Sequence, residues 1–288
     1  MSAMSVGTAV APRRRSPALT IAGWEFRTSV RARWVLAMAA VFGVLCLIVT
    51  LLGFRTVREL GLSGIGPASA TLINLGILLP SLMGLVLGSG AIVGAREQGL
   101  LAMMAAQPMR RSSIAGGAFL GLTASMWTTL GMGYGVALLV MSSVARASDI
   151  PALVTLICAT LGVAAASVAI GIAMSSFASN RAQAVAGGVG LWIVFSLGVD
   201  LALAALAPSV HLGPQGLLAA IMLNPLEAGR ILALLGTNFR GTALGPFGAY
   251  LVSTFGTVGA IGVLVGALAA WTIGPLLLAR WALPRRDL

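Results

Sequence analysis

The chain has 288 residues, of which 58% are hydrophobic and 9% are charged, and its mean hydropathy is +1.01. A soluble domain carries about 25% charged residues because its surface must face water, so this composition excludes an ordinary soluble enzyme. The 18 basic residues are all arginines, and seven acids leave a net charge of +11. The arginines cluster at the ends of apolar runs, which indicates membrane topology beside anionic lipid and no nucleic-acid partner.

Residues 1–33 are predicted to form a cytoplasmic tail and an amphipathic elbow helix. Ser16-Pro17 is typical of a helix start, because a capping hydroxyl precedes a proline at the first helical position. Apolar residues then recur at helical spacing, namely Leu19, Ala22, Phe26 and Val30. A helix of this kind lies in the membrane surface with its arginines toward the head groups; an irregular basic tail is the alternative. The predicted elbow residues are Trp24, Phe26, Arg27 and Arg31.

Residues 34–288 are predicted to form one transmembrane domain. A helix needs about 20 apolar residues to cross a hydrocarbon core of roughly 30 Å. Six segments meet this requirement, at residues 34–54, 71–93, 114–141, 150–177, 184–206 and 250–278. The predicted fold class is therefore all-α, a polytopic membrane protein with six spans.

The distribution of arginines sets the predicted orientation. One set of loops and tails contains Arg13, Arg14, Arg15, Arg27, Arg31, Arg33, Arg96, Arg110, Arg111, Arg181, Arg280, Arg285 and Arg286. The alternate loops contain Arg55, Arg58, Arg146, Arg230 and Arg240. The richer side faces the cytoplasm, so we expect a multi-pass protein of the cell inner membrane with both termini in the cytoplasm.

The segment between the second and third spans, residues 94–111, is a candidate docking element. It is too short, and too charged at its ends, to cross lipid. One face of a helix here would carry Leu100, Met103, Met104 and Gln107. A short Met-rich face suits insertion into a groove of another protein; a helix resting on the lipid surface is the alternative.

Motif residues run through this loop: Glu97-x-Gly99-Leu100-Leu101, then Pro108, Arg110 and Arg111, Ile114 and Gly117. They resemble the pattern of type-2 ABC transporter permeases, E-x-G-[TL]-L, P-x-x-R, then an aliphatic residue and G-K. Ala118 departs from that pattern, because it stands where the family often has lysine. The resemblance implies a coupling helix that docks on a nucleotide-binding subunit through Arg96, Glu97, Gly99, Leu100, Met103, Met104, Pro108, Arg110 and Arg111.

Other stretches follow in order along the chain: Ala91-Ile92-Val93-Gly94, Trp192-Ile193-Val194-Phe195, Asp200-Leu201-Ala202-Leu203, and Leu223-Asn224-Pro225 with Arg230. They resemble the NosY-type permeases, the membrane subunits of the transporter that serves maturation of nitrous oxide reductase. The resemblance implies export of a sulfur or copper species. It also implies a periplasmic accessory protein that docks on the outer helices.

Between the fifth and sixth spans, residues 215–223 and 227–235 are apolar helical pieces too short to cross the membrane. They are separated at Asn224-Pro225, which favours a re-entrant or external helical hairpin, because non-helical backbone at membrane depth must be buried in protein or line water. A surface-lying loop is the alternative. In the family that the chain resembles, paired external helices close the outer mouth.

Asp200 lies inside an apolar run, where an ionisable residue suggests a functional role. It could line the substrate path or gate, lie solvated at the outer interface, or pair with Arg230 or Arg240. The candidate residues of the pathway or outer gate are Asp200, Asn224, Pro225, Glu227 and Arg230.

The chain contains no G-x-x-x-x-G-K-[ST] phosphate loop, so we expect a non-catalytic subunit that binds no cofactor, with ATP and Mg on its partner. Its two cysteines and one histidine predict no metal site. The leading hypothesis is the membrane subunit of an ABC exporter. Its expected partners are a cytoplasmic ATP-binding subunit, a second copy of the chain, a periplasmic accessory protein and membrane lipid. The alternatives are a secondary transporter or channel that uses Asp200, and a structural membrane scaffold.

Overall fold

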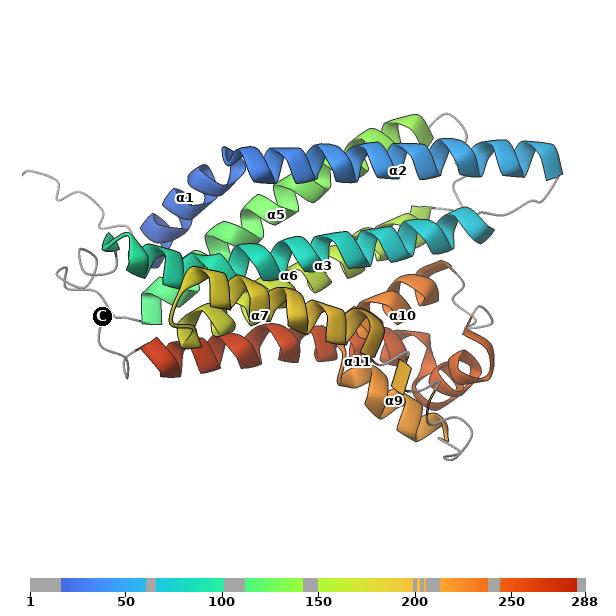
Figure 1. Ribbon diagram of the computed structural model, residues 1–288. Helices are drawn as coiled ribbons and strands as arrows, with labels where there is room; N and C mark the ends of the chain where they lie inside the picture. The colour runs from blue at the N-terminus through green and yellow to red at the C-terminus, as the bar shows by residue number, and fades with distance from the viewer. Residues whose placement is uncertain are drawn as a thin grey trace, which may run out of the picture.

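The computed structural model describes residues 17–60, 66–100, 112–141, 150–198, 201–202, 205, 213–237 and 244–283. Within these ranges the regular elements are all helical, which confirms the all-α fold class. They are α1 (Pro17–Val30), α2 (Arg33–Leu60), α3 (Gly66–Glu97), α5 (Ser112–Met141), α6 (Ile150–Phe177), α7 (Arg181–Ile193), the π-helical turn η2 (Val194–Gly198), α9 (Pro214–Met222), α10 (Pro225–Thr237) and α11 (Gly245–Ala282). The long helices run side by side in one bundle (Figure 1).

Five elements are long and apolar enough to cross a membrane: α2, α3, α6, α7 together with η2, and α11. They cover five of the six predicted spans. The remaining predicted span, residues 114–141, is the 30-residue helix α5, which is not among the five. The pair α9 and α10 becomes a sixth candidate if it is counted as one broken span. The six-span count therefore stays a prediction.

The two helices α3 and α6 cross so closely that their backbones are in contact. A Cβ atom on Gly88 would lie 3.0 Å from the Cα of Gly171, so only glycine fits there without a shift. Ser175 of α6 strengthens this crossing, because its Oγ accepts the N–H groups of Ile92 and Val93 at 3.1 and 2.9 Å. Small residues at helix crossings are how membrane helices associate without a hydrophobic drive.

On one side of the central crossing of α3 and α6, the bundle is formed by α1, α2 and α5 (Figure 1). A Cβ atom on Gly121 of α5 would lie 2.6 Å from the Cβ of Glu25, so α1 lies directly on α5. Phe42 of α2 contacts Tyr134 of α5 edge to face, with 5.2 Å between ring centroids. The Tyr134 hydroxyl is hydrogen-bonded to Thr160 of α6 at 2.8 Å. This hydrogen bond links the α5 side of the bundle to the central crossing.

Two of the predicted spans are less regular than the sequence suggests. The segment predicted at 184–206 changes from an α-helix to the π-helical turn at Val194. The segment predicted at 250–278 lies inside α11, where Gly256 has φ 70° and ψ 169° and kinks the helix. A glycine adopts positive φ without steric cost, which explains why the kink falls at this residue.

We predict that Gly88→Ala lowers the melting temperature of the protein in detergent. The new methyl group would meet the backbone of Gly171 and Ile172 at 3.0 Å, and such overpacking costs about 1–3 kcal/mol. Gly131→Ala is the matched control, because no atom lies within 4 Å of a Cβ built on Gly131. The melting temperatures are measured by heating each variant and recording the fraction that stays folded by fluorescence-detected size exclusion. Equal melting temperatures for the two variants would contradict this packing.

Candidate functional site

The helix α3 ends where the predicted coupling loop begins. The N–H of Gly99 donates to the carbonyl of Arg96 at 3.0 Å, and the φ of Gly99 is +71°. Left-handed backbone of this kind is typical of a glycine just past a helix end, which gives the E-x-G motif a structural reason. Leu100 is partly buried. The other predicted coupling residues lie outside the described part of the chain: Met103, Met104, Pro108, Arg110 and Arg111.

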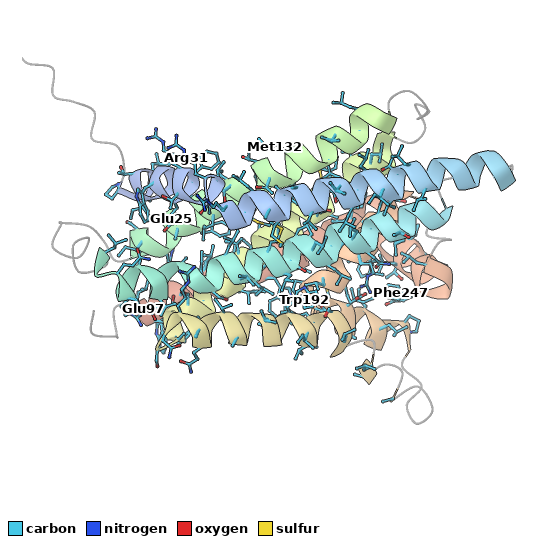
Figure 2. All side chains as sticks on the ribbon, turned by 45° about the horizontal axis from the view of Figure 1, so that its top comes forward. Glu25, Arg31, Glu97, Met132, Trp192 and Phe247 are labelled. Carbon is cyan, nitrogen blue, oxygen red and sulfur yellow. The ribbon has the colours of Figure 1, made fainter. Side chains whose placement is uncertain are left out.

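Glu97 connects the end of α3 to the start of α7. Its Oε1 accepts the N–H of Arg181 at 2.8 Å, and Arg181 is the first residue of α7. The first N–H groups of a helix lack partners within the helix, and a carboxylate there also interacts favourably with the helix dipole. Glu97 therefore stabilises the N-terminus of a helix that lies 84 positions away in the sequence. Figure 2 shows it at the end of the bundle where α7 begins.

The neighbouring residue Arg96 forms a hydrogen bond to the other side of the turn that joins α6 to α7. Its Nη1 donates to the carbonyl of Ala178 at 3.2 Å, directly after α6 ends at Phe177. Arg96 and Glu97 together therefore hold both the end of α6 and the start of α7. We call this arrangement, formed by Arg96, Glu97, Ala178 and Arg181, the turn clamp.

The turn between α6 and α7 also contains its own cap, which sequence reasoning missed. The Asn180 side chain accepts the N–H of Gln183 at 2.8 Å, and the Gln183 side chain accepts the N–H of Ser179 at 3.0 Å. This is a variant of the capping box, in which Gln183 reaches the N–H of the residue before the N-cap Asn180; its sequence signature is a short polar residue followed three positions later by Gln or Glu. Asn180-x-x-Gln183 was therefore a readable signal. The contact with Glu97 was not, because it joins distant segments.

At the opposite end of the bundle, α9 and α10 meet at a bend of 116°. Asn224 lies at this bend and is fully buried. Its Nδ2 donates to the carbonyl of Phe195 at 2.6 Å, and its Oδ1 accepts the N–H of Leu226 at 3.0 Å. Asn224 therefore caps α10, which begins at Pro225, and also bonds α10 to the π-helical turn after α7. The break predicted at Asn224-Pro225 is confirmed.

The end of α9 is hydrogen-bonded to a tryptophan of α11. Nε1 of Trp271, on α11, donates to the carbonyl of Met222 at 2.9 Å, at the end of α9. Its ring contacts Phe195 edge to face, with 5.5 Å between centroids. The bend between α9 and α10 is thus bonded to η2 on one side and to α11 on the other. This set of contacts, formed by Asn224, Phe195, Met222 and Trp271, is called the bend anchor below.

The first two turns of α10 carry a paired acid and base. Nη1 of Arg230 donates to Oε1 of Glu227 at 2.5 Å, and both side chains are largely buried. Gly229 lets α10 approach α6 closely, because a Cβ there would overlap the side chain of Val163. The structure therefore gathers Asn224, Pro225, Glu227 and Arg230 at one place. Asp200 lies outside the described residues.

The elbow residues do not all face the way that the sequence spacing predicts. Leu19 and Trp24 are 60% and 43% exposed, whereas Ile21 is buried, and Arg27 and Arg31 are exposed. Phe26 is partly buried. The face of α1 that contacts α5 is formed by Ala18, Ile21, Ala22 and Glu25. Leu19 lies outside this contact face, because the small residues of α5 select the face that approaches closest; the orientation of the apolar residues toward lipid stays a prediction.

Glu25, which sequence reasoning did not select, is the acid on this contact face. Its Cβ lies 2.6 Å from a Cβ built on Gly121, and desolvation by burial raises the pKa of its carboxyl from 4.5 to about 7. Burial has this effect because a low-dielectric environment disfavours the charged form. The charge state of Glu25 therefore changes near neutral pH.

The described helices fit a transporter permease: several are long and apolar enough to cross a membrane, a bent pair precedes the last long helix, and an E-x-G motif lies at the end of α3. The family model described as ABC-2 family transporter protein matches residues 19–288, and the chain belongs to this family. Over 275 residues it is 30% identical to the probable ABC transporter permease protein NosY of Pseudomonas aeruginosa, covering 93% of this chain and 98% of that protein. It is 31% identical over 277 residues to the same-named protein of Stutzerimonas stutzeri, with the same coverage.

Membership makes the chain a multi-pass membrane subunit of an ABC transporter, which works with an ATP-binding partner subunit. The resemblance seen in the sequence is thereby confirmed.

We predict that docking of α1 on α5 weakens as pH rises. The docked carboxyl of Glu25 has a pKa of about 7 against 4.5 when free, so its contribution is fully present below about pH 4.5 and is lost as pH rises through about 7. Glu25→Gln should remove the fall in melting temperature between pH 5 and pH 8. Arg27→Gln, on the exposed face of α1, should keep the pH dependence of the parent; a parent curve that is already flat refutes the assignment.

Proposed function

We propose that the chain is the membrane-spanning, non-catalytic subunit of an ATP-driven exporter that works as a homodimer. The observation that carries this proposal is the turn clamp, which attaches the start of the coupling loop to two long helices of the bundle. A loop attached in this way can transmit force from a partner to the helices. Family membership supplies the kind of partner, an ATP-binding subunit.

The ATP-binding subunit docks on the coupling loop from the cytoplasm. Arg96, Glu97, Gly99 and Leu100 begin this loop, and the Met-rich face predicted around Met103 and Met104 enters a groove of the partner. A flexible, polarisable methionine suits such a groove. ATP and Mg are bound by the partner, and closure of two ATP-binding subunits around ATP drives the change between inward-facing and outward-facing states.

The bent pair α9–α10 closes the pathway on the outer side. Support comes from its geometry: two helices of 9 and 13 residues are each too short to span, and Asn224 at their bend is buried. Helix ends at membrane depth are tolerated where protein satisfies them, and the bend anchor does this. In this proposal Asp200, Glu227 and Arg230 line the path or its gate. Both termini lie in the cytoplasm, and the elbow helix α1 rests at that membrane surface.

A second copy of the chain pairs along α2 and α5. Within the bundle α2 leaves much apolar surface uncovered, including Leu36, Val44 and Leu52. An apolar groove of about 320 Å³ lies between α2 and α5 and is lined by Gly43, Val44, Met132 and neighbouring residues. Two copies are needed because ATP binds between two ATP-binding subunits, each of which needs a coupling loop.

The cargo and the compartment are proposed from the resemblance to NosY-type permeases, which serve maturation of nitrous oxide reductase. Both relatives are described as probable ABC transporter permease proteins NosY. We propose that the chain lies in the cell inner membrane, moves a sulfur or copper species outward, and receives a periplasmic accessory protein on its outer helices.

The docking proposal predicts that an ATPase copurifies with this chain from native membranes in mild detergent. Replacing Met103 and Met104 together with aspartate should remove the ATPase, because two charges would enter its apolar groove. The matched control places the same two charges on the other face of the predicted helix, at Ala102 and Ala105, and should keep the ATPase bound. If the parent chain captures no ATPase, the exporter proposal fails.

A further inference from the structure

We propose that α3 and α7 move as one lever, fixed to each other by the turn clamp, and that Asn224 transfers this movement to the outer pair α9–α10. Glu97 and Asn224 are then positioning residues: neither needs to touch the ATPase or the cargo. This inference rests on the proposed function, because the movement begins at the coupling loop.

The near end of the lever is the bond between Glu97 and the N–H of Arg181. This hydrogen bond is charge-assisted, because its acceptor is a carboxylate, and Glu97 is the last residue of α3 before the chain enters the loop. The side chain of Arg181 also lies across α3, with its Nε 3.3 Å from a Cβ built on Gly90. A displacement of the loop therefore pulls α7 as directly as it pulls α3.

Farther along the bundle, α7 is bonded to α3 a second time. Nε1 of Trp192 donates to Oγ of Ser81 at 3.0 Å and to the carbonyl of Leu78 at 3.2 Å. Between these two attachments Gly188 contacts the side chain of Ser89. Two attachments prevent α7 from sliding along α3. Figure 2 shows Glu97 and Trp192 widely separated along the same two helices.

The far end of the lever is the π-helical turn. The element from Arg181 to Gly198 has 18 residues and so spans about 27 Å at 1.5 Å per residue. At its end the carbonyl of Phe195 accepts Nδ2 of Asn224 at 2.6 Å. The same bend is held to α11 through Trp271. Movement of α7 relative to α11 must therefore shift or open the bend.

The experiment follows a label on α9 while nucleotide acts on the ATPase. Gln215, exposed at the start of α9, is replaced by cysteine in a Cys158→Ala background, since Cys158 is the exposed native cysteine and Cys46 is buried. The complex with its ATPase is reconstituted in vesicles. The rate of modification by a membrane-impermeant maleimide is compared with and without ATP plus orthovanadate, and ATPase binding is measured on the same samples.

In the parent, the rate of maleimide modification with ATP plus orthovanadate should differ clearly from the rate without them. The ratio of these two rates is the quantity compared between variants. Glu97→Ala should reduce this ratio at least about threefold, as expected for loss of a charge-assisted hydrogen bond, while the ATPase stays bound. Glu97→Gln should keep most of the ratio, because its amide oxygen still accepts the N–H of Arg181. Gln98→Ala, at the adjacent exposed position, should match the parent.

A second variant tests the far end independently. Asn224→Ser retains an oxygen that can cap α10 but removes the Nδ2 donor to Phe195, so it should also lower the ratio with the ATPase bound. The lever is refuted if Glu97→Ala or Asn224→Ser leaves the ratio unchanged, or if Glu97→Ala releases the ATPase, which would make Glu97 a docking residue. A parent that binds no ATPase or gives no nucleotide response refutes the proposed function instead.

Discussion

Where a helix breaks inside a membrane, its free N–H and C=O groups have no water to bond, and each must find a partner within the protein. This constraint applies at the bend between α9 and α10, where Asn224 is fully buried, whereas the turn after α6 is exposed to solvent and is held by side-chain hydrogen bonds. At one end of the bundle the turn after α6 takes its partners from Arg96 and Glu97 of α3. At the other, the bend between α9 and α10 takes them from Asn224 and Trp271. The residues that satisfy the breaks are therefore also those that tie distant helices together.

Close helix crossings supply the complementary constraint. Where glycines face one another, as at Gly88 and Gly171, the backbones of α3 and α6 touch, and a serine hydroxyl enters between the helices to reach two backbone N–H groups. Such a crossing resists sliding, because every displacement separates packed atoms and unpairs buried polar groups. The contact of α1 with α5 also uses glycines, at Gly117 and Gly121, but it includes Glu25, whose raised pKa predicts that this docking depends on pH.

Some residues that the sequence suggests for contact with a partner or a pathway in fact bond one helix of the bundle to another. Glu97 belongs to a motif that predicts contact with an ATPase, yet its carboxylate bonds within the chain. Asn224 was expected at the break between two helices, and it also reaches the turn that ends α7. Both residues therefore act on the arrangement of helices, whatever the cargo is.

The sequence alone predicted a lipid environment, the helical class and the break at Asn224-Pro225. Long runs of apolar residues indicate lipid, and the residue before a proline is disfavoured in a helix, so both signals are local. It could not determine that Leu19 faces outward or that Glu25 faces α5, because the packing partner selects the face. It could not pair Glu97 with Arg181 or Asn224 with Phe195 either. Those contacts span 84 and 29 positions, and only the tertiary packing of helices brings them within bonding distance.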